Sequence, residues 1–162
     1  MSARILLVTG SRALDDHVQA LHWEREQVSA RADSFRPTLV VTGDARGPDE
    51  SARVHAKRRG LPLECWSLSG WVAAWGAGRD RRWWPESEPP LTPRHWPLER
   101  NRRMVAHVAE LAKTAEATLV LALYAPWSRT QGTAHTVGLA RAAGLTVIEA
   151  TCPAEYGPGV RS

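Results

Sequence analysis

Short runs of apolar residues alternate along the chain with longer segments whose apolar residues recur at helical spacing. The apolar runs lie at 4–9, 38–42, 63–68, 118–123 and 145–148. The helical patterns lie at about 15–35, 48–59, 98–113 and 134–143. Continuous apolar runs are typical of strands covered on both faces, and their alternation with helices favours a parallel sheet. We therefore expect an α/β fold, a Rossmann-like three-layer α/β/α arrangement with a mostly parallel sheet of about five strands.

Residues 69–97 break this alternation and form an insert rich in tryptophan and proline. The insert holds five tryptophans, five prolines and the basic run 79–82. Proline at this density excludes a long helix or a central strand, so we expect a long loop. Trp71 and Trp75, four residues apart, fit one face of a short helix. Two roles stay open: Trp83 and Trp84 stack a base beside the basic run, or the tryptophans pack against the core or a second copy.

Length, charge and cysteine content limit the class of protein. A chain of 162 residues fits one domain over 1–150, with a surface tail at 151–162. The net charge of +4 suits an anionic small molecule as well as a polyanion. The longest apolar run, 118–125, is far shorter than the roughly 18 residues of a membrane span. With two cysteines, Cys65 and Cys152, and no signal-like start, we expect a cytoplasmic protein without membrane contact, disulfide framework or zinc site.

Three glycine-containing loops follow buried strands and precede helices. They contain Gly10-Ser11-Arg12, Gly43-Asp44-Ala45-Arg46-Gly47 and Gln131-Gly132-Thr133. In parallel sheets, ligands bind beyond the carboxyl ends of the strands, and glycine lets an anion approach the backbone N–H groups of a helix start. The planar fork of donors on arginine matches phosphate. The three loops together therefore predict a pocket for a phosphate-bearing ligand.

In combination with Glu99-Arg100-Asn101 and Met104, these loops resemble the SLOG superfamily, over about residues 4–150 without the insert. The closer resemblance is to its YspA-like branch, which has a Gly-Ser-Arg turn, a Gly-Gly-Ala-Arg-Gly-Ala-Asp loop and an Arg-Asn-x-x-Met helix. The resemblance implies a Rossmann-like fold, a homodimer, and binding of nucleotides or nucleotide-derived ligands. LOG-type members of the superfamily cleave the N-glycosidic bond of nucleoside monophosphates, and other members sense nucleotide signals or assist DNA processing.

The resemblance assigns roles residue by residue. Arg100 matches the helix arginine of the LOG pattern and is implied to contact the ribose phosphate, and Gly132-Thr133 matches the phosphate-binding turn. Where LOG enzymes carry a catalytic glutamate, two residues after that threonine, this chain has His135. An imidazole does not stabilise the oxocarbenium-like state that a carboxylate stabilises. A hydrolase would therefore need another carboxylate, for which Asp44 is the first candidate.

Asp49 and Glu99 are the next candidates for that carboxylate. Simpler structural interpretations also stay open: Asp44 fixes its turn, Asp49 complements the dipole of its helix, and His135 is an ordinary surface histidine.

The favoured interpretation is a sensor or carrier that binds a nucleotide or nucleotide-derived ligand. One alternative is a nucleotide N-glycosidase with Asp44, Arg100 and His135 as catalytic candidates, and a second is a nucleic-acid-processing accessory protein. No motif requires a metal or a cofactor. The expected ligand-binding residues are Gly10, Ser11, Arg12, Gly43, Asp44, Arg46, Gly47, Asp49, Arg100, Asn101, Gln131, Gly132 and Thr133.

Overall fold

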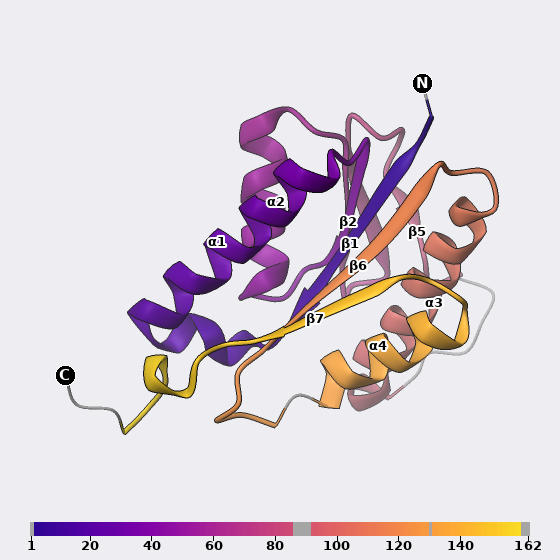
Figure 1. Ribbon diagram of the computed structural model, residues 1–162. Helices are drawn as coiled ribbons and strands as arrows, with labels where there is room; N and C mark the ends of the chain where they lie inside the picture. Colours follow the sequence, from indigo (N-terminus) through magenta and orange to yellow (C-terminus); the bar gives the residue numbers. More distant parts are fainter. Residues whose placement is uncertain (1, 86–91, 130, 160–162) are drawn as a thin grey trace.

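A seven-stranded sheet lies between two layers of helices in the computed structural model, which describes residues 2–85, 92–129 and 131–159 (Figure 1). The strands are β1 (Arg4–Gly10), β2 (Leu39–Gly43), β3 (Leu63–Trp66), β4 (Trp71–Trp75), β5 (Arg81–Arg82), β6 (Ala117–Tyr124) and β7 (Val147–Thr151). The helices are α1 (Val18–Phe35), α2 (Pro48–Arg59), α3 (Trp96–Ala112) and α4 (Gln131–Ala142), with 3-10 turns η1 (Arg12–Asp16), η2 (Pro93–His95) and η3 (Ala154–Tyr156).

The order of strands across the sheet is β5-β4-β3-β2-β1-β6-β7. Strands β3, β2, β1, β6 and β7 are parallel to one another. At one edge of the sheet, β4 pairs antiparallel with β3, and β5 pairs antiparallel with β4. The predicted α/β class and the five parallel strands are thereby confirmed. The chain first builds outward from β1 through β2 and β3 and later returns to the other side of β1 with β6. The switch point of the sheet therefore lies beside β1.

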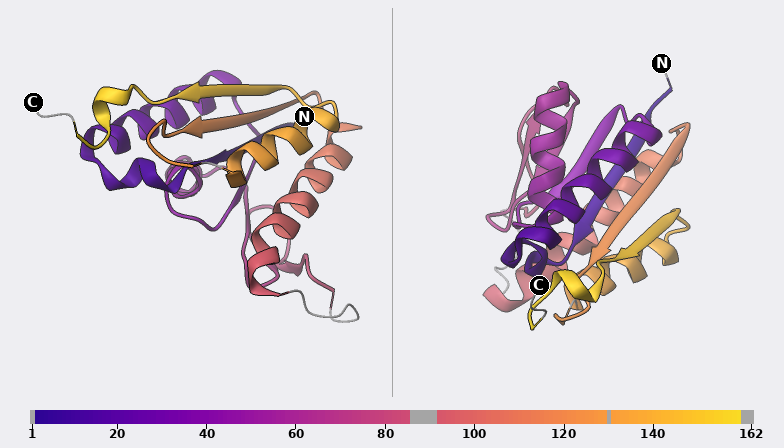
Figure 2. Two further views of the ribbon diagram at one scale, coloured as in Figure 1. Left: turned by 90° about the horizontal axis from the view of Figure 1, so that it is seen from below. Right: turned by 60° about the vertical axis from the view of Figure 1, so that its left-hand side comes forward.

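Burial on both faces of the sheet explains the continuous apolar runs. Along β1, Leu6 and Val8 pack in one core cluster while Ile5 and Leu7 pack in the other. The alternation arises because successive side chains of a strand point to opposite faces. Helices α1 and α2 cover the first face, and α3 and α4 cover the second, as the further views of Figure 2 also show.

The insert is a hairpin at the sheet edge over its first half, not a loop. Trp71 and Trp75 begin and end β4, so the expectation of a short helix is wrong; residues four apart share a face on a strand as well. Trp83 and Trp84 are only 5% and 9% exposed and pack with Trp96, so the interpretation that they stack a base is wrong and the packing interpretation holds. Residues 86–91 of the insert lie outside the described residues.

A buried carboxylate fastens this hairpin to the core. Glu64 of β3 accepts hydrogen bonds from Arg81 Nη2 at 3.0 Å and from Trp66 Nε1 at 3.2 Å, and His107 Nε2 lies 3.1 Å away. Burial alone would raise the pKa of Glu64, but the hydrogen bonds from His107 and Arg81 outweigh burial and hold the pKa at about 2. The carboxylate therefore stays ionised, and its contacts with Arg81 and His107 join β3 to both β5 and α3.

The first part of the tail is packed rather than loose. Thr151 belongs to β7, Cys152 is 1% exposed, and η3 follows directly. A Cβ at Gly157 would stand 2.2 Å from the ring of Trp127, so the tail presses closely on that ring. Because Trp127 precedes α4, the tail supports the third glycine-containing loop. No helix in the described part of the chain is long and apolar enough to cross a bilayer.

Candidate functional site

The three predicted loops meet around one pocket of about 840 Å³ at the carboxyl ends of β1, β2 and β6. Helix α3 and the segment after β3 complete its wall. Its lining includes Gly10, Ser11, Arg12, Asp44, Arg46, Asp49, Leu68, Pro97, Arg100, Asn101, Met104, Ser128, Arg129, Gly132 and Thr133. The topology favours a site here, because at the switch point the loops after β1 and β6 lead to opposite faces of the sheet and leave a crevice between them.

Close packing fixes the first loop at the end of β1. A Cβ on Gly10 would stand 2.4 Å from Pro48 Cγ and 2.7 Å from the carbonyl oxygen of Leu123, so only glycine fits there. The backbone N–H of Ser11 donates to that same carbonyl at 2.9 Å. The hydroxyl of Ser11 accepts from Ala13 N at 3.3 Å and so caps η1. The first loop therefore starts from a rigid junction between β1, β6 and α2.

The second loop rests on its own glycines and on Arg53. A Cβ on Gly43 would stand 2.6 Å from Asp49 Oδ2 and 2.7 Å from Arg100 Nη1. Gly47 adopts a φ of 85°, which favours glycine. Arg53 Nη1 donates to the carbonyl oxygens of Gly43 at 2.8 Å and of Ala45 at 3.0 Å. Gly43 and Gly47 thus determine the shape of the loop without lining the pocket, whereas Asp44 and Arg46 between them do line it.

Arg100 forms a buried anchor on the pocket floor. It is 6% exposed, and its Nη1 donates to the Trp66 carbonyl at 2.7 Å and to Asp44 Oδ1 at 3.1 Å. Its Nε donates to Asn101 Oδ1 at 2.8 Å. The other oxygen of Asp44 accepts from Leu68 N at 3.1 Å. Asp44 is therefore an oriented carboxylate that ties the second loop to the segment after β3, as the turn-fixing interpretation anticipates.

Asp49 places a second carboxyl on the floor, in the first turn of α2. It is 5% exposed and accepts from Ala45 N at 3.3 Å. Burial raises the pKa of Asp49 to about 6, against the opposing effect of the Arg100 and Arg53 charges. The carboxyl of Asp49 therefore becomes charged at a higher pH than an ordinary aspartate.

The rim of the pocket carries three arginines. Arg12 and Arg129 are exposed, and neither side chain forms a hydrogen bond or an ion pair with another described residue. Arg46 pairs with Asp16 at 3.2 Å, but both partners are half exposed, and such pairs contribute little. Arg129 and Ser128 are lining residues that the sequence reasoning missed. A basic residue in a loop between a buried strand and a helix, as at Arg12, is the pattern that would have indicated Arg129.

Two predicted residues stand apart from this lining. The buried side of α4 carries Thr133, Thr136, Val137 and Ala140 at helical spacing, and His135 lies off that face, exposed. The structure therefore places His135 outside the pocket wall. The side chain of Gln131 lies outside the described part of the structure.

Glu99 also stays outside the wall. It pairs with Arg102 and Arg103, and the hydrogen bonds from these arginines hold its pKa at about 2. It is thus committed to α3 and not to the pocket. Within the described residues, no group of three His, Cys, Asp or Glu side chains is arranged to hold a metal ion.

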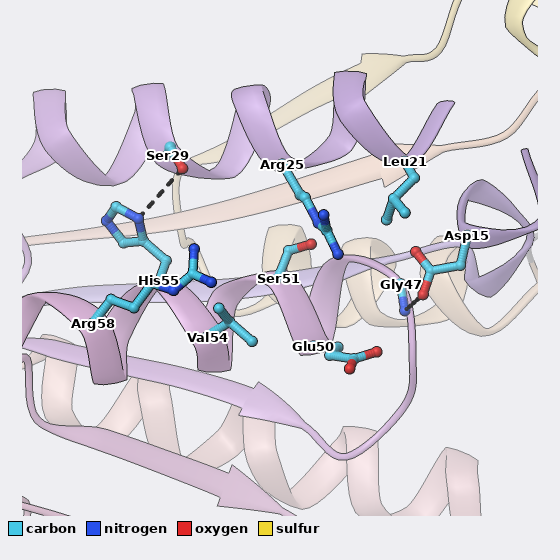
Figure 3. A pocket seen from close by; sticks show the side chains of 10 residues that line it. All are labelled: Asp15, Leu21, Arg25, Ser29, Gly47, Glu50, Ser51, Val54, His55 and Arg58. Carbon is cyan, nitrogen blue, oxygen red and sulfur yellow. Dashed lines mark hydrogen bonds between the residues drawn. The ribbon is translucent and has the colours of Figure 1, made fainter. Parts of the chain in front are cut away.

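A smaller cavity of about 230 Å³ lies behind the first two loops, between α1 and α2 (Figure 3). Figure 3 shows Asp15 pointing at the backbone of Gly47, whose N–H donates to Asp15 Oδ2 at 2.9 Å. Glu24 of α1 is fully buried beside this bond and accepts from Ser51 Oγ at 2.8 Å. Asp15 Oδ1 and Glu24 Oε1 are buried and, as acceptors, meet no donor within the described residues, so a proton on Glu24 supplies the donor between the two carboxyl groups. Burial, with Asp15 nearby, raises the pKa of Glu24 to about 8.

Neither protein-family models nor curated protein sequences give a match to this chain. Among solved structures, its fold is similar to the X-ray structure of DNA processing protein A (DprA) from Streptococcus pneumoniae, with a TM-score of 0.46 and 16% sequence identity. The similarity covers 90% of this chain and 58% of the DprA chain, so this chain spans less than two thirds of that one. This likeness concerns the course of the chain only. The SLOG resemblance, with its YspA-like branch and its homodimer, stays a prediction.

Proposed function

We propose that the pocket binds a nucleotide or a nucleotide-derived ligand whose phosphate groups lie between the rim arginines and the start of α4. The observation that carries this proposal is the convergence of Arg12 and Arg129 on one hollow of about 840 Å³, where neither side chain pairs with another residue that the structure describes. Guanidinium groups pair with phosphate through two donors at once. The first turn of α4 adds backbone N–H groups and the positive end of a helix dipole.

The rest of the wall suits the nucleoside part of such a ligand. Leu68, Pro97 and Met104 give one side of the pocket an apolar surface against which a base can lie. Asp44 and Asn101 offer acceptor oxygens to ribose hydroxyls or to the amino group of a base. A pocket of this size holds a ligand of nucleotide dimensions, because small-molecule sites are typically about 300 to 1,000 Å³.

Removal of one rim charge is expected to weaken nucleotide binding about tenfold. Each of Arg12→Gln and Arg129→Gln deletes a charge-assisted contact with phosphate. Both are expected to leave the fold unchanged, because neither side chain bonds to another residue in the described ranges. Calorimetric titration of nucleoside mono- and diphosphates, with the parent nucleosides beside them, measures the effect.

Arg31→Gln is the matched control, because it deletes the same charge near the C-terminal end of α1, away from the pocket lining. We expect its nucleotide affinity to equal that of the wild type. If nucleosides bind as tightly as nucleotides, or if both rim variants bind like the wild type, the proposal fails.

N-glycosidic hydrolysis is a second candidate function, favoured by the position of Asp44. Its carboxylate lines the pocket and is oriented by Arg100 Nη1 at 3.1 Å and by Leu68 N at 3.1 Å. A carboxylate held in this way stabilises an oxocarbenium-like state without moving. His135 takes no part in this candidate mechanism, because it lies outside the wall.

A chromatographic search for free base among products from nucleoside monophosphates tests this second candidate. Asp44→Asn is expected to lower base release at least about a hundredfold if the carboxylate acts on the reacting sugar. Asp33→Asn makes the same chemical change on the exposed surface of α1 and is expected to leave release unchanged. Absence of base release in the wild-type protein would restrict the pocket to binding.

A further inference from the structure

Two exposed tryptophans lie on one face of β4, the edge strand that begins at the pocket end of the sheet. Trp71 and Trp75 are 41% and 42% exposed, whereas tryptophan is a strongly buried residue on average. They share a face of the strand because they are four residues apart, and they lie about 13 Å from each other along it. Val72, which points to the opposite face, is fully buried. The exposure is therefore confined to one side of the hairpin.

A cation lies over each of these rings. Lys57 Nζ of α2 is 4.0 Å from the centroid of the Trp75 ring, and the guanidinium carbon of Arg82 is 4.5 Å from that of Trp71. Such contacts orient the rings and keep positive charge beside them. Lys57 forms no ion pair with a described residue, so its charge is available to a partner. We call Trp71, Trp75, Lys57 and Arg82 the aromatic-basic stripe.

The Trp71 end of this stripe lies toward the pocket, and the Trp75 end lies away from it. The antiparallel register sets Val72 opposite Trp66, so β4 begins at the sheet end that carries the pocket. Leu68 lines the pocket and lies three residues before Trp71. Helix α2 contacts β1, β2 and β3, and β4 extends the sheet beyond it. The Lys57 and Arg82 side chains lie over these rings, yet Trp71 and Trp75 stay 41% and 42% exposed.

We propose that the nucleotide in the pocket is part of a single-stranded nucleic acid, and that the adjoining nucleotides run along β4 over the aromatic-basic stripe. The proposal rests on the proposed function of the pocket. Bases of a single strand are free to stack on the two indole rings, and their phosphates lie near Lys57 and Arg82. A duplex is excluded from this binding mode, because its bases are already stacked on each other.

Charge favours this occupant over a second copy of the chain. Lysine is depleted from protein interfaces, yet Lys57 lies directly on one of the two exposed rings. Aromatic rings flanked by cations match a polyanion with flat apolar bases, and the net charge of +4 acts in the same direction.

Fluorescence anisotropy with a labelled oligothymidylate of about 12 nucleotides tests the proposal on the full chain. Thymidine monophosphate and a duplex of the same length are measured as competitors. We expect the oligothymidylate to bind more tightly than either competitor. Trp71→Leu and Trp75→Leu are each expected to weaken it about fivefold or more, whereas Trp71→Phe, which keeps a stacking ring, retains most of the affinity. Lys57→Gln is expected to reduce the slope of log affinity against log salt by about 0.7.

Val18→Ala is the control, because it trims another apolar side chain that is 72% exposed, on α1. Wild-type affinity for thymidine monophosphate in the Trp71→Leu and Trp75→Leu variants shows that the pocket is intact. If the oligothymidylate binds no tighter than the monophosphate, or if both leucine variants bind it like the wild type, the stripe proposal is wrong and the pocket proposal survives. If neither ligand binds, both proposals fail. Sedimentation that shows self-association lost in Trp71→Leu, without an effect on oligothymidylate, assigns the stripe to a second copy and overturns the proposal.

Discussion

Gly10→Ala is expected to lower the free energy of unfolding by about 3 kcal/mol, the upper part of the range for overpacked interiors. The added methyl would stand 2.4 Å from Pro48 Cγ and 2.7 Å from the Leu123 carbonyl oxygen. Neither neighbour can yield easily, since Pro48 begins α2 and the carbonyl accepts the hydrogen bond of Ser11 N. Relief requires β1, β6 and α2 to separate at the point where the pocket begins. Urea denaturation with an unchanged m-value measures the loss.

Gly138→Ala, the same chemical change at another position, is expected to raise the free energy of unfolding. Gly138 lies within α4, and a Cβ there meets no described atom within 4 Å apart from the backbone of its own helix. Alanine should therefore stabilise the protein by about 0.5 to 1 kcal/mol through helix propensity. Equal stability of Gly10→Ala and Gly138→Ala would show that the junction at the end of β1 tolerates a side chain, contrary to this packing.

Glu24→Gln is expected to stabilise the protein by about 2 kcal/mol near pH 8. The buried carboxyl of Glu24 has its pKa raised to about 8, from an ordinary value of 4.5. Between these two values the unfolded chain releases the proton while the folded chain retains it. The contribution of Glu24 to stability is therefore complete below about pH 4.5 and is lost progressively as the pH rises to about 8. Glutamine keeps an acceptor for Ser51 and a donor toward Asp15 and has no charge to expose.

Denaturation midpoints from about pH 5 to about pH 9 test this expectation. The wild-type stability should fall with rising pH over the lower part of that range more steeply than that of Glu24→Gln. Glu26→Gln, an exposed change two residues along α1, is expected to follow the wild type. Parallel curves for Glu24→Gln and the wild type would mean that Glu24 is ionised in the folded protein.

The parallel part of the sheet was predictable because burial on both faces leaves a continuous apolar run, as in Ile5 to Val8. The hairpin of β4 and β5 was not predictable by the same reasoning. A tryptophan pair four residues apart fits one face of a helix and one face of a strand equally well. The prolines that argue against a central strand lie after this hairpin, and the hairpin occupies an edge position.

The pocket loops were predictable because glycine after a buried strand marks the carboxyl end of the sheet. Residues whose role depends on contacts between separate elements were missed. Glu24 resembles any surface glutamate in a helical pattern, and only the approach of Asp15 and Ser51 buries it. Arg129 follows Pro126 and Trp127 and not a glycine. The glycine pattern of the first two loops therefore indicated Gly132 in this loop and not Arg129.

The position of β1 at the switch point has a mechanical consequence for any bound ligand. The loops after β1 and β2 form one side of the pocket, the loop after β6 forms the other, and α3 lies across the floor. The β1–β6 ladder joins the two sides. A ligand that contacts both sides of the pocket therefore crosslinks them. Its occupancy should delay the separation of the two sides on heating, because a ligand that contacts both sides is released when they part.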